Sequence, residues 1–138
     1  MATMTIRQRQ AFLSDLHVGV VSIARKQNGP LTVPIWYDYE ADGKVWMITS
    51  SSSIKGRLLK NTSRISLCAQ SEQPPYQYVT VEGPFSIQPL QPEQLLHMAT
   101  RYLGPERGKA YTDASTNSGD NIVISLTPET WYTVDYSL

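Results

Sequence analysis

A series of short β-favouring runs, separated by turn signals, most constrains how this chain can fold. The runs span residues 17–24, 31–39, 45–49, 64–70, 76–87, 122–126 and 131–136. Asn28-Gly29 and Asp42-Gly43 separate the first three runs, and both dipeptides are typical of tight β-hairpins. About seven strands connected so closely predict a mainly β fold, either an antiparallel barrel or a sandwich.

Helices are predicted only at the margins of this sheet. Residues 5–16 have an amphipathic pattern, and residues 92–103 run from a proline to a glycine stop. Residues 104–119 are polar and punctuated by glycine, which predicts a long loop with room for a short helix at 109–111.

Two strands carry residues that disturb a regular ladder. Pro34 lies within the run 31–39, and proline cannot donate a ladder hydrogen bond, so it predicts an edge strand or a bulge. Gly83-Pro84 predicts a kink or bulge in the long run 76–87.

Length, charge and cysteine content limit the kinds of protein that this sequence can encode. The 138 residues fit one domain, 1–138, and 12 Lys and Arg balance 12 Asp and Glu. A net charge of zero provides no field for nucleic acid or a membrane surface, and it permits self-association. The sequence shows no signal peptide and no run long enough to span a bilayer, so a cytoplasmic protein is expected. Cys68 is the only cysteine, which excludes an intrachain disulfide.

No catalytic or metal-binding constellation is evident. The two histidines, His17 and His97, have no metal-ligand spacing, and Cys68 fits a packed, inert thiol. The glycine patterns of dinucleotide-binding and P-loop folds are absent from the sequence.

Residues 48–61 join a strand end, four consecutive serines and a short basic helix. Serines suit a turn and a helix N-cap, where a hydroxyl accepts from a free backbone N–H. Lys55, Arg57 and Lys60 add positive charge. A helix N-terminus with hydroxyl donors and a lysine favours a phosphate group. The alternative is a solvated turn followed by an ordinary charged helix surface.

Aromatic residues cluster at 36–39, 76–78 and 131–136. They are mostly Tyr and Trp, whose amphipathic rings favour ligand walls and protein interfaces. The alternative is that part of these aromatic residues simply belong to a tyrosine-rich barrel surface.

Several of these blocks together resemble the pyridoxamine 5′-phosphate oxidase-like family of flavin-binding split barrels. Residues 49–67 are similar to its T-x-x-x-S-R-K-x-x-x-L-x-x-N-P-R-V-S-L block, and residues 34–40 to its P-V-W-Y-x-Y-E strand. Residues 79–83 resemble its V-x-V-E-G strand, and residues 102–104 a motif in its helix. The blocks occur in the family's order and cover most of the chain.

The resemblance implies a six- to seven-stranded antiparallel split barrel that forms a homodimer, with FMN at the interface. It also implies a flavin-dependent oxidoreductase acting on a small-molecule substrate. The positions that match the family's cofactor contacts are Pro34, Ile35, Trp36, Thr49, Ser50, Ser53, Lys55, Arg57, Tyr76 and Tyr78. Among them, Ser53 and Lys55 match the phosphate site, the strand through Trp36 matches the ring site, and the segment from Tyr76 to Tyr78 matches the side supplied by the partner subunit.

The chain departs from the family pattern at one cofactor position. The arginine of the family's S-R-K motif is Ile54 here, and Arg57, one helical turn on, is the candidate replacement. A related branch uses the deazaflavin coenzyme F420, which is therefore the alternative cofactor. Residues 131–138 lack the C-terminal Arg and His motif of true pyridoxamine 5′-phosphate oxidases, which argues against vitamin B6 oxidation.

Three functions are compatible with the sequence, in this order. The first is an FMN- or deazaflavin-dependent oxidoreductase, in which the cofactor supplies the hydride chemistry. The second is a flavin carrier or redox sensor without turnover, and the third is a barrel that has lost its ligand. Substrate contacts in this family lie on variable loops, to which residues 104–119 correspond.

Overall fold

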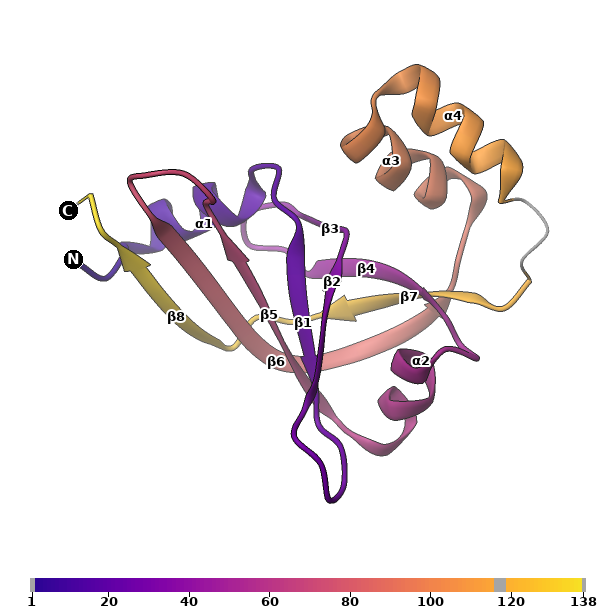
Figure 1. Cartoon of the computed structure of the whole chain (residues 1–138), viewed down its shortest axis with the longest axis horizontal. Coiled ribbons are helices and arrows are strands. Elements are labelled where there is room, and N and C mark those ends of the chain that lie inside the picture. The colour runs from indigo at the N-terminus through magenta and orange to yellow at the C-terminus, as the bar shows by residue number, and fades with distance from the viewer. Residues whose placement is uncertain (1, 116–118, 138) are drawn as a thin grey trace.

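The computed structural model describes residues 2–115 and 119–137, and its twisted antiparallel strands have helices at their margins (Figure 1). The strands are β1 (Gly19–Ile23), β2 (Leu31–Ile35), β3 (Tyr37–Tyr39), β4 (Val45–Ser50), β5 (Arg64–Gln70), β6 (Gln77–Pro89), β7 (Asn121–Leu126) and β8 (Thr130–Asp135). The helices are α1 (Ile6–Ser14), α2 (Ile54–Leu58), α3 (Pro92–Leu103) and α4 (Pro105–Ala114), and a 3₁₀ turn, Leu59–Asn61, follows α2. The predicted mainly β class and split barrel are confirmed.

Seven strands form one continuous antiparallel path in the order β2-β1-β5-β6-β7-β4-β3, and β8 pairs with β6 beside it. The two ends of this path, β2 and β3, are consecutive in the chain and are joined by Trp36 alone. Among the described residues no ladder links β2 to β3, so the barrel is closed here by the chain and not by hydrogen bonds between strands. Trp36 therefore lies at the split of the barrel.

Strand β6 belongs to both halves of the barrel. Its first half pairs with β5 and β8, and its second half, from Phe85 onward, pairs with β7. Gly83 lies at the change of partner, where a Cβ atom would be only 1.9 Å from the carbonyl oxygen of Thr127. Glycine is needed for this close approach of two backbones. The predicted irregularity at residues 83–84 is the point where the strand passes from one half to the other.

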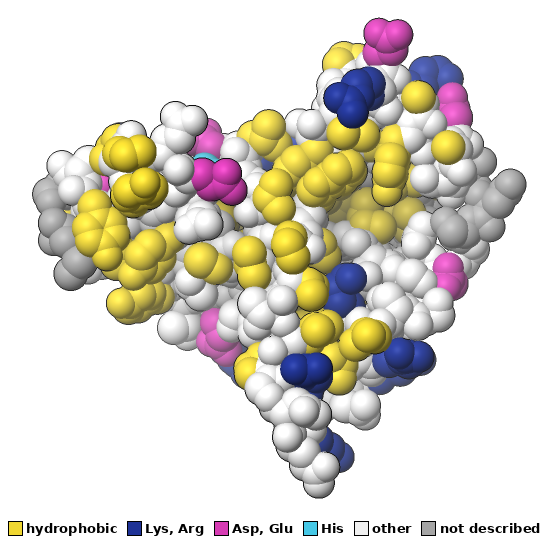
Figure 2. Space-filling model, viewed as in Figure 1, with side chains coloured by type: hydrophobic (Ala, Val, Ile, Leu, Met, Phe, Trp, Pro, Cys, Tyr) yellow, Lys and Arg dark blue, Asp and Glu magenta, His cyan; other side chains and the backbone are white. Residues whose placement is uncertain are grey.

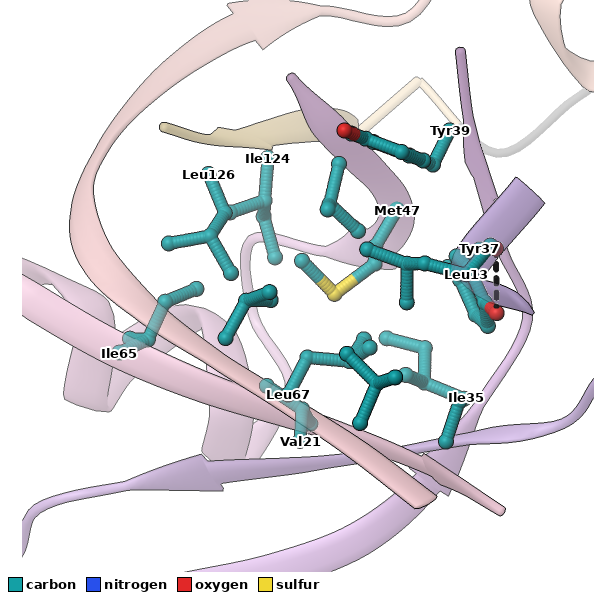
Figure 3. Close-up of a cluster of buried hydrophobic side chains, with 14 of the residues drawn as sticks. Leu13, Val21, Ile35, Tyr37, Tyr39, Met47, Ile65, Leu67, Ile124 and Leu126 are labelled. Carbon is teal, nitrogen blue, oxygen red and sulfur yellow. Dashed lines mark hydrogen bonds between the residues drawn. The ribbon is translucent and has the colours of Figure 1, made fainter. Parts of the chain in front are cut away.

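The core fills the space between the inward faces of the strands. Figure 3 shows side chains from distant strands pointing toward one another, among them Leu67, Met47 and Ile124. Alternate residues along β1, β4 and β5 are buried, as expected for strands with one packed face. Helix α1 covers one end, and the buried Tyr37 hydroxyl donates a 2.8 Å hydrogen bond to the carbonyl of Leu13 on that helix.

Two predictions about the second strand are refined by the structure. Pro34 lies on the edge strand β2, as its missing N–H requires, and pairs with Val20. The strand is nevertheless divided at Trp36 and not at the proline. The β1–β2 connection spans residues 24–30, longer than a tight turn, and its left-handed residue is Gln27.

The long loop predicted for residues 104–119 is wrong over most of its length, because α4 occupies residues 105–114. Gly104, with φ of 84°, ends α3 and turns the chain directly into α4. The two helices lie side by side at one end of the molecule (Figure 1). Residues 116–118 of the predicted loop lie outside the described residues. None of the described helices is both long and apolar enough to cross a bilayer.

Candidate functional site

The turn of residues 50–53, called the serine turn below, connects β4 to α2. Ser53 is the N-cap of α2, and its Oγ accepts a 3.1 Å hydrogen bond from the backbone N–H of Gly56. This is the cap predicted for the serine run, and it satisfies one of the free N–H groups at the helix start. A Cβ atom on Gly56 would lie 2.4 Å from the carbonyl oxygen of Ser50, so glycine lets the helix begin directly against the turn.

Hydroxyl groups of the turn bond to one another and to the backbone. The Oγ of Ser53 donates to the carbonyl of Ser50 at 2.7 Å, and it lies 3.2 Å from Oγ1 of Thr49. Thr49 is buried at the end of β4. The predicted site residues Thr49, Ser50 and Ser53 are therefore brought together in one small polar network.

A carboxylate that the sequence did not reveal joins this network. The hydroxyls of Ser50 and Ser52 both donate 2.7 Å hydrogen bonds to Oδ2 of Asp120. These bonds, from Ser52 first and then Ser50, hold the pKa of Asp120 below its ordinary value. The serine turn thus donates hydrogen bonds to an anion, and Asp120 adds a negative charge beside it.

The cations predicted for this site, Lys55 and Arg57, both follow the turn, in α2. Lys55 is half-buried and Arg57 is exposed, and neither forms an ion pair with any other described residue. Both remain available to an added anion. Ile54, by contrast, has 56% of its surface exposed, a high value for an isoleucine.

At the split of the barrel, Trp36 packs against aromatic rings from both α3 and α4. Its ring is stacked on Tyr102, with centroids 4.9 Å apart and planes at 7°. Tyr111 from α4 lies against it at 5.7 Å with a tilt of 49°. The residue at the strand break is thus held in place by the helical pair.

The hydroxyl of Tyr102 satisfies backbone groups that the broken ladder leaves free. It accepts from the N–H of Tyr37 at 3.0 Å and lies 2.6 Å from the carbonyl oxygen of His17. Burial raises the pKa of Tyr102 above its ordinary value. This residue belongs to the motif matched at residues 102–104, and its role here is structural.

Beside Trp36 is a cavity of about 380 Å³ without any charged side chain in its lining. Its walls are Val18, Pro34, Ile35, Trp36, Ile48, Leu95, Met98 and Tyr111. Figure 2 shows apolar side chains gathered below the helical pair, where the surface is hollowed. The structure thus brings the three predicted ring-site residues, Pro34, Ile35 and Trp36, into one apolar pocket, which we call the Trp36 pocket.

The Trp36 pocket and the serine turn lie along the same face of β4. Alternate residues of β4 are buried, so Ile48 and Ser50 both project outward. Two residues along a strand are separated by roughly 7 Å. An apolar pocket and a polar, cationic turn therefore follow each other at a spacing that one small molecule can span.

Tyr76 and Tyr78 are not brought to this pocket by their own chain. Tyr78 pairs with Gln70 on β5, and both β5 and β1 separate β6 from β2, a distance of about 14 Å at ordinary strand spacing. Tyr78 is stacked on Tyr132 of β8 instead, and its hydrogen bond with Tyr132 raises its pKa.

A charged cluster on the other side of α3 was also missed from the sequence. His97 Nε2 lies 2.6 Å from Oδ2 of Asp38, and Arg101 Nη1 lies 3.3 Å from Oδ1 of the same carboxylate. Arg101 also donates to backbone carbonyls, including that of Tyr37 at 3.1 Å. These contacts fasten α3 to β3. Within the described residues, no group of three His, Cys, Asp or Glu side chains is arranged to hold a metal ion.

Comparison with known families decides the classification. A family model described as pyridoxamine 5′-phosphate oxidase matches residues 6–135. The chain belongs to this family. A search of curated proteins found no match to the sequence.

Solved structures in this family's fold support the same architecture. A conserved hypothetical protein from Mycobacterium tuberculosis is 21% identical, with a TM-score of 0.75 over 96% of this chain and 86% of that one. An F420 reductase is 20% identical, with a TM-score of 0.74 over 89% of this chain and 94% of that one. An FAD-binding protein from Mesorhizobium loti is 17% identical, with a TM-score of 0.71 over 96% of this chain and 95% of that one. At these identities the likeness concerns the fold.

Proposed function

We propose that this member of the pyridoxamine 5′-phosphate oxidase family binds FMN and acts as a flavin-dependent oxidoreductase on a small-molecule acceptor. The observation that carries the proposal is the succession, along β4, of the uncharged Trp36 pocket and the serine turn with its free cations. A flavin mononucleotide combines the same two properties, a flat apolar ring and a phosphate.

The donor set of the serine turn fits a phosphate. Lys55 would hold the phosphate oxygens together with Ser53, whose hydroxyl proton would turn from the Ser50 carbonyl to the phosphate. Arg57 would be a second, more exposed cation in place of the arginine that Ile54 replaces. The hydroxyls of Ser50 and Ser52 give their single protons to the Asp120 carboxylate, so the turn already holds one anionic oxygen, and a phosphate would have to replace that carboxylate as their acceptor.

The ring would lie along Pro34, Ile35 and Trp36, and these residues would orient it and exclude water. Bound flavin supplies hydride chemistry without a protein acid or base, which agrees with a pocket that has no charged lining. A nicotinamide coenzyme is the class of reductant that we expect, and the acceptor gains two electrons.

We further propose a homodimer in which the outward-facing Tyr76 and Tyr78 of one copy reach the cofactor of the other. Tyr76 is half exposed and lies outside the pocket of its own chain. Closed two-fold pairing is the commonest arrangement of identical subunits. Light scattering at micromolar concentration should show a dimer, and a monomer alone would contradict this part of the proposal.

Coenzyme F420 is the second candidate, favoured by the similarity to an F420 reductase and by the missing arginine at Ile54. Titrating the purified protein with each cofactor, followed by absorbance, decides between them. Bleaching of the bound flavin by a nicotinamide coenzyme separates an oxidoreductase from a carrier, and failure to bind either cofactor would point to a barrel that has lost its ligand.

Two lysine variants test the phosphate site. Lys55→Ala should weaken FMN binding by about ten- to a hundredfold, because a hydrogen bond to a charged group contributes about 1.5–3 kcal/mol. Riboflavin, which lacks the phosphate, should lose less. Lys60→Ala, on the exposed side of the same segment, is the matched control. Equal FMN affinities for Lys55→Ala and the unmodified protein would mean that the serine turn is only a turn.

Two further comparisons test the rest of the site. Ile54→Arg should tighten FMN by restoring a second cation near the phosphate. Trp36→Ala should weaken FMN more than Trp131→Ala, because Trp131 contacts Tyr39 and Arg9 away from the pocket. Calorimetric titration measures all of these affinities, and equal losses for the two tryptophan variants would contradict the ring placement.

A further inference from the structure

We propose that the hollow between the first half of α3 and the outer face of β3, β4 and β7 is a second ligand site, which takes a small arylalkylamine in its cationic form. We call this hollow the Trp46 cleft. Its volume is about 650 Å³, and its lining shares no residue with that of the Trp36 pocket. Helix α3 contributes Glu93 and His97 to the cleft but Leu95 and Met98 to the pocket, so the helix separates the two sites.

The floor of the cleft is aromatic. Trp46 projects from the outer face of β4, between its cross-strand partners Asp38 on β3 and Ser125 on β7. Trp46 is half-buried, and the imidazole of His97 lies against it with ring centroids 5.8 Å apart. The exposed part of the indole offers a flat surface for a second ring, and a hollow of this volume is within the range of small-ligand sites.

The helical wall of the cleft is held in place without a ligand. Both oxygens of Asp38 are engaged, one with His97 and the other with Arg101 and with the backbone N–H of Tyr39. Because Arg101 balances its charge, Asp38 serves to fasten α3 over the sheet. The cleft is therefore formed in advance, and a ligand does not have to order it.

The remaining charged groups of the cleft favour a cation. Glu40, Glu93 and Lys44 line it, and none of the three forms an ion pair with another described residue. Two free carboxylates against one free ammonium leave a net negative charge. Glu40 follows β3 and Glu93 begins α3, so the carboxylates approach Trp46 from two elements. An anionic ligand would gain less from this field than a cation.

The aromatic floor and the carboxylates together define the class of ligand. A flat ring can stack on the indole of Trp46, and an ammonium group on a short chain can then reach Glu40 or Glu93 for a charge-assisted hydrogen bond. A neutral aromatic molecule would gain only the stacking. An aliphatic amine would gain only the charge interaction and a cation–π contact.

Three probes with one ring and one chain length test the charge preference. Phenethylamine is cationic at neutral pH, phenethyl alcohol is neutral and hydrocinnamate is anionic. Binding is followed by NMR through the indole N–H signal of Trp46, which Trp46→Phe assigns. We expect the amine to bind about three- to tenfold more tightly than the alcohol and the carboxylate to bind most weakly, with smaller differences in high salt.

Substitutions in the cleft separate stacking from charge. Glu93→Gln should weaken the amine by about two- to fivefold and leave the alcohol unchanged, whereas Lys44→Gln should tighten the amine by a similar factor. Trp46→Leu should weaken both probes by about tenfold, as read from the backbone amides of α3, because each loses its stacking partner. Glu106→Gln, on the exposed surface of α4 outside the cleft, is the matched control and should change neither affinity.

The outcomes distinguish this second site from the cofactor site. Phenethylamine should move the indole signal of Trp46 and leave that of Trp36 in place, whereas FMN should move the signal of Trp36. The absence of saturable binding, equal affinities for the three probes, or an amine affinity unaltered by Glu93→Gln and Lys44→Gln would overturn the second site and leave the proposed function standing. If FMN and coenzyme F420 fail to bind while the amine binds with the expected responses, the second site stands and the cofactor proposal fails.

Discussion

The serine turn and the helical pair α3–α4 flank the same outward face of β4, and they are held in place by different interactions. The turn is fixed by short hydrogen bonds, most of them between residues no more than four positions apart, such as Ser53 and Gly56. The helical pair is fixed by ring stacking, by a glycine contact between backbones, and by a tyrosine hydroxyl that bonds residues 65 and 85 positions away.

This difference teaches where specificity can reside in such a fold. A turn stabilised mostly by its own neighbours, with Asp120 as a distant partner, depends less on what packs elsewhere, which suits a phosphate common to many cofactors. A wall assembled from remote contacts can be altered by exchanging one helix, which suits recognition of different acceptors. The comparison can be tested by substitutions that remove the hydrogen bonds of the turn or disturb the packing of the helical pair.

The largest effect is expected from Gly108→Ala. Helix propensity alone favours alanine over glycine by about 1 kcal/mol. The added Cβ would meet the Thr100 backbone at 2.7 Å, and overpacking of this kind costs about 1–3 kcal/mol. Because the added Cβ meets backbone atoms and not a flexible side chain, we take the upper end of that cost and expect a net loss of about 2 kcal/mol in denaturant unfolding, with faster amide exchange in α4. Lys109→Ala, which removes only an exposed ion pair with Asp113, is the control. A more stable Gly108→Ala protein would show that the helices are not pressed together.

Tyr102→Phe tests the hydroxyl without removing the stacked ring. The variant leaves the N–H of Tyr37 without its acceptor, and an unsatisfied buried group costs about 1–2 kcal/mol. The free energy of unfolding should fall by that amount, whereas Tyr136→Phe should leave it unchanged. An unaltered free energy for Tyr102→Phe would mean that water replaces the hydroxyl at the split.

Ser53→Ala removes the helix cap in the serine turn. Loss of an N-cap hydroxyl costs typically about 1 kcal/mol, and the Oγ bond to the Ser50 carbonyl is lost as well. Ser51→Ala is the neighbouring control. Because the turn is held locally, the loss should not alter the fluorescence of Trp36. A shift in that fluorescence would show that turn and pocket are coupled.

The smallest effect is expected from Asp120→Asn. The carboxylate places a negative charge beside the phosphate site that we assign to Ser53 and Lys55, so its removal should tighten FMN by no more than about fivefold. The gain should shrink in high salt.

Because the folded-state pKa of Asp120 is lowered, its hydrogen bonds stabilise the fold above its ordinary carboxyl pKa and lose that effect as pH falls through the lowered value. Asp120→Asn should therefore flatten the acid side of the stability profile, and an unchanged profile would contradict the interaction.

The same contrast explains what could be predicted from the sequence. The passage from β4 through the serine cap into α2 was predicted correctly because each signal acts on residues a few positions away. The helix α4 was missed because Gly108 has the pattern of a helix breaker, and its value appears only when α3 lies against it. Asp120 was missed because its two partners lie about seventy positions earlier in the chain.

Other features depended on topology. The break at Trp36 could not be distinguished from one at Pro34, since both ends of the barrel path must be known before the split can be placed. The ring-site residues Pro34, Ile35 and Trp36 do share a pocket, and their contact with a cofactor stays a prediction. Contact of Tyr76 and Tyr78 with a partner copy also stays a prediction.

The strand β6, shared between the two halves of the barrel, bears on how the molecule unfolds. One continuous backbone supplies ladder partners to β5 and β8 up to Pro84 and to β7 from Phe85 onward. Neither half can therefore dissolve and leave the second with all of its pairings. Two sheets that were linked only by loops could melt in separate steps. We expect this chain to lose both halves in a single cooperative transition. Denaturant unfolding followed at Trp46 in one half and at Trp131 in the other should therefore give the same midpoint.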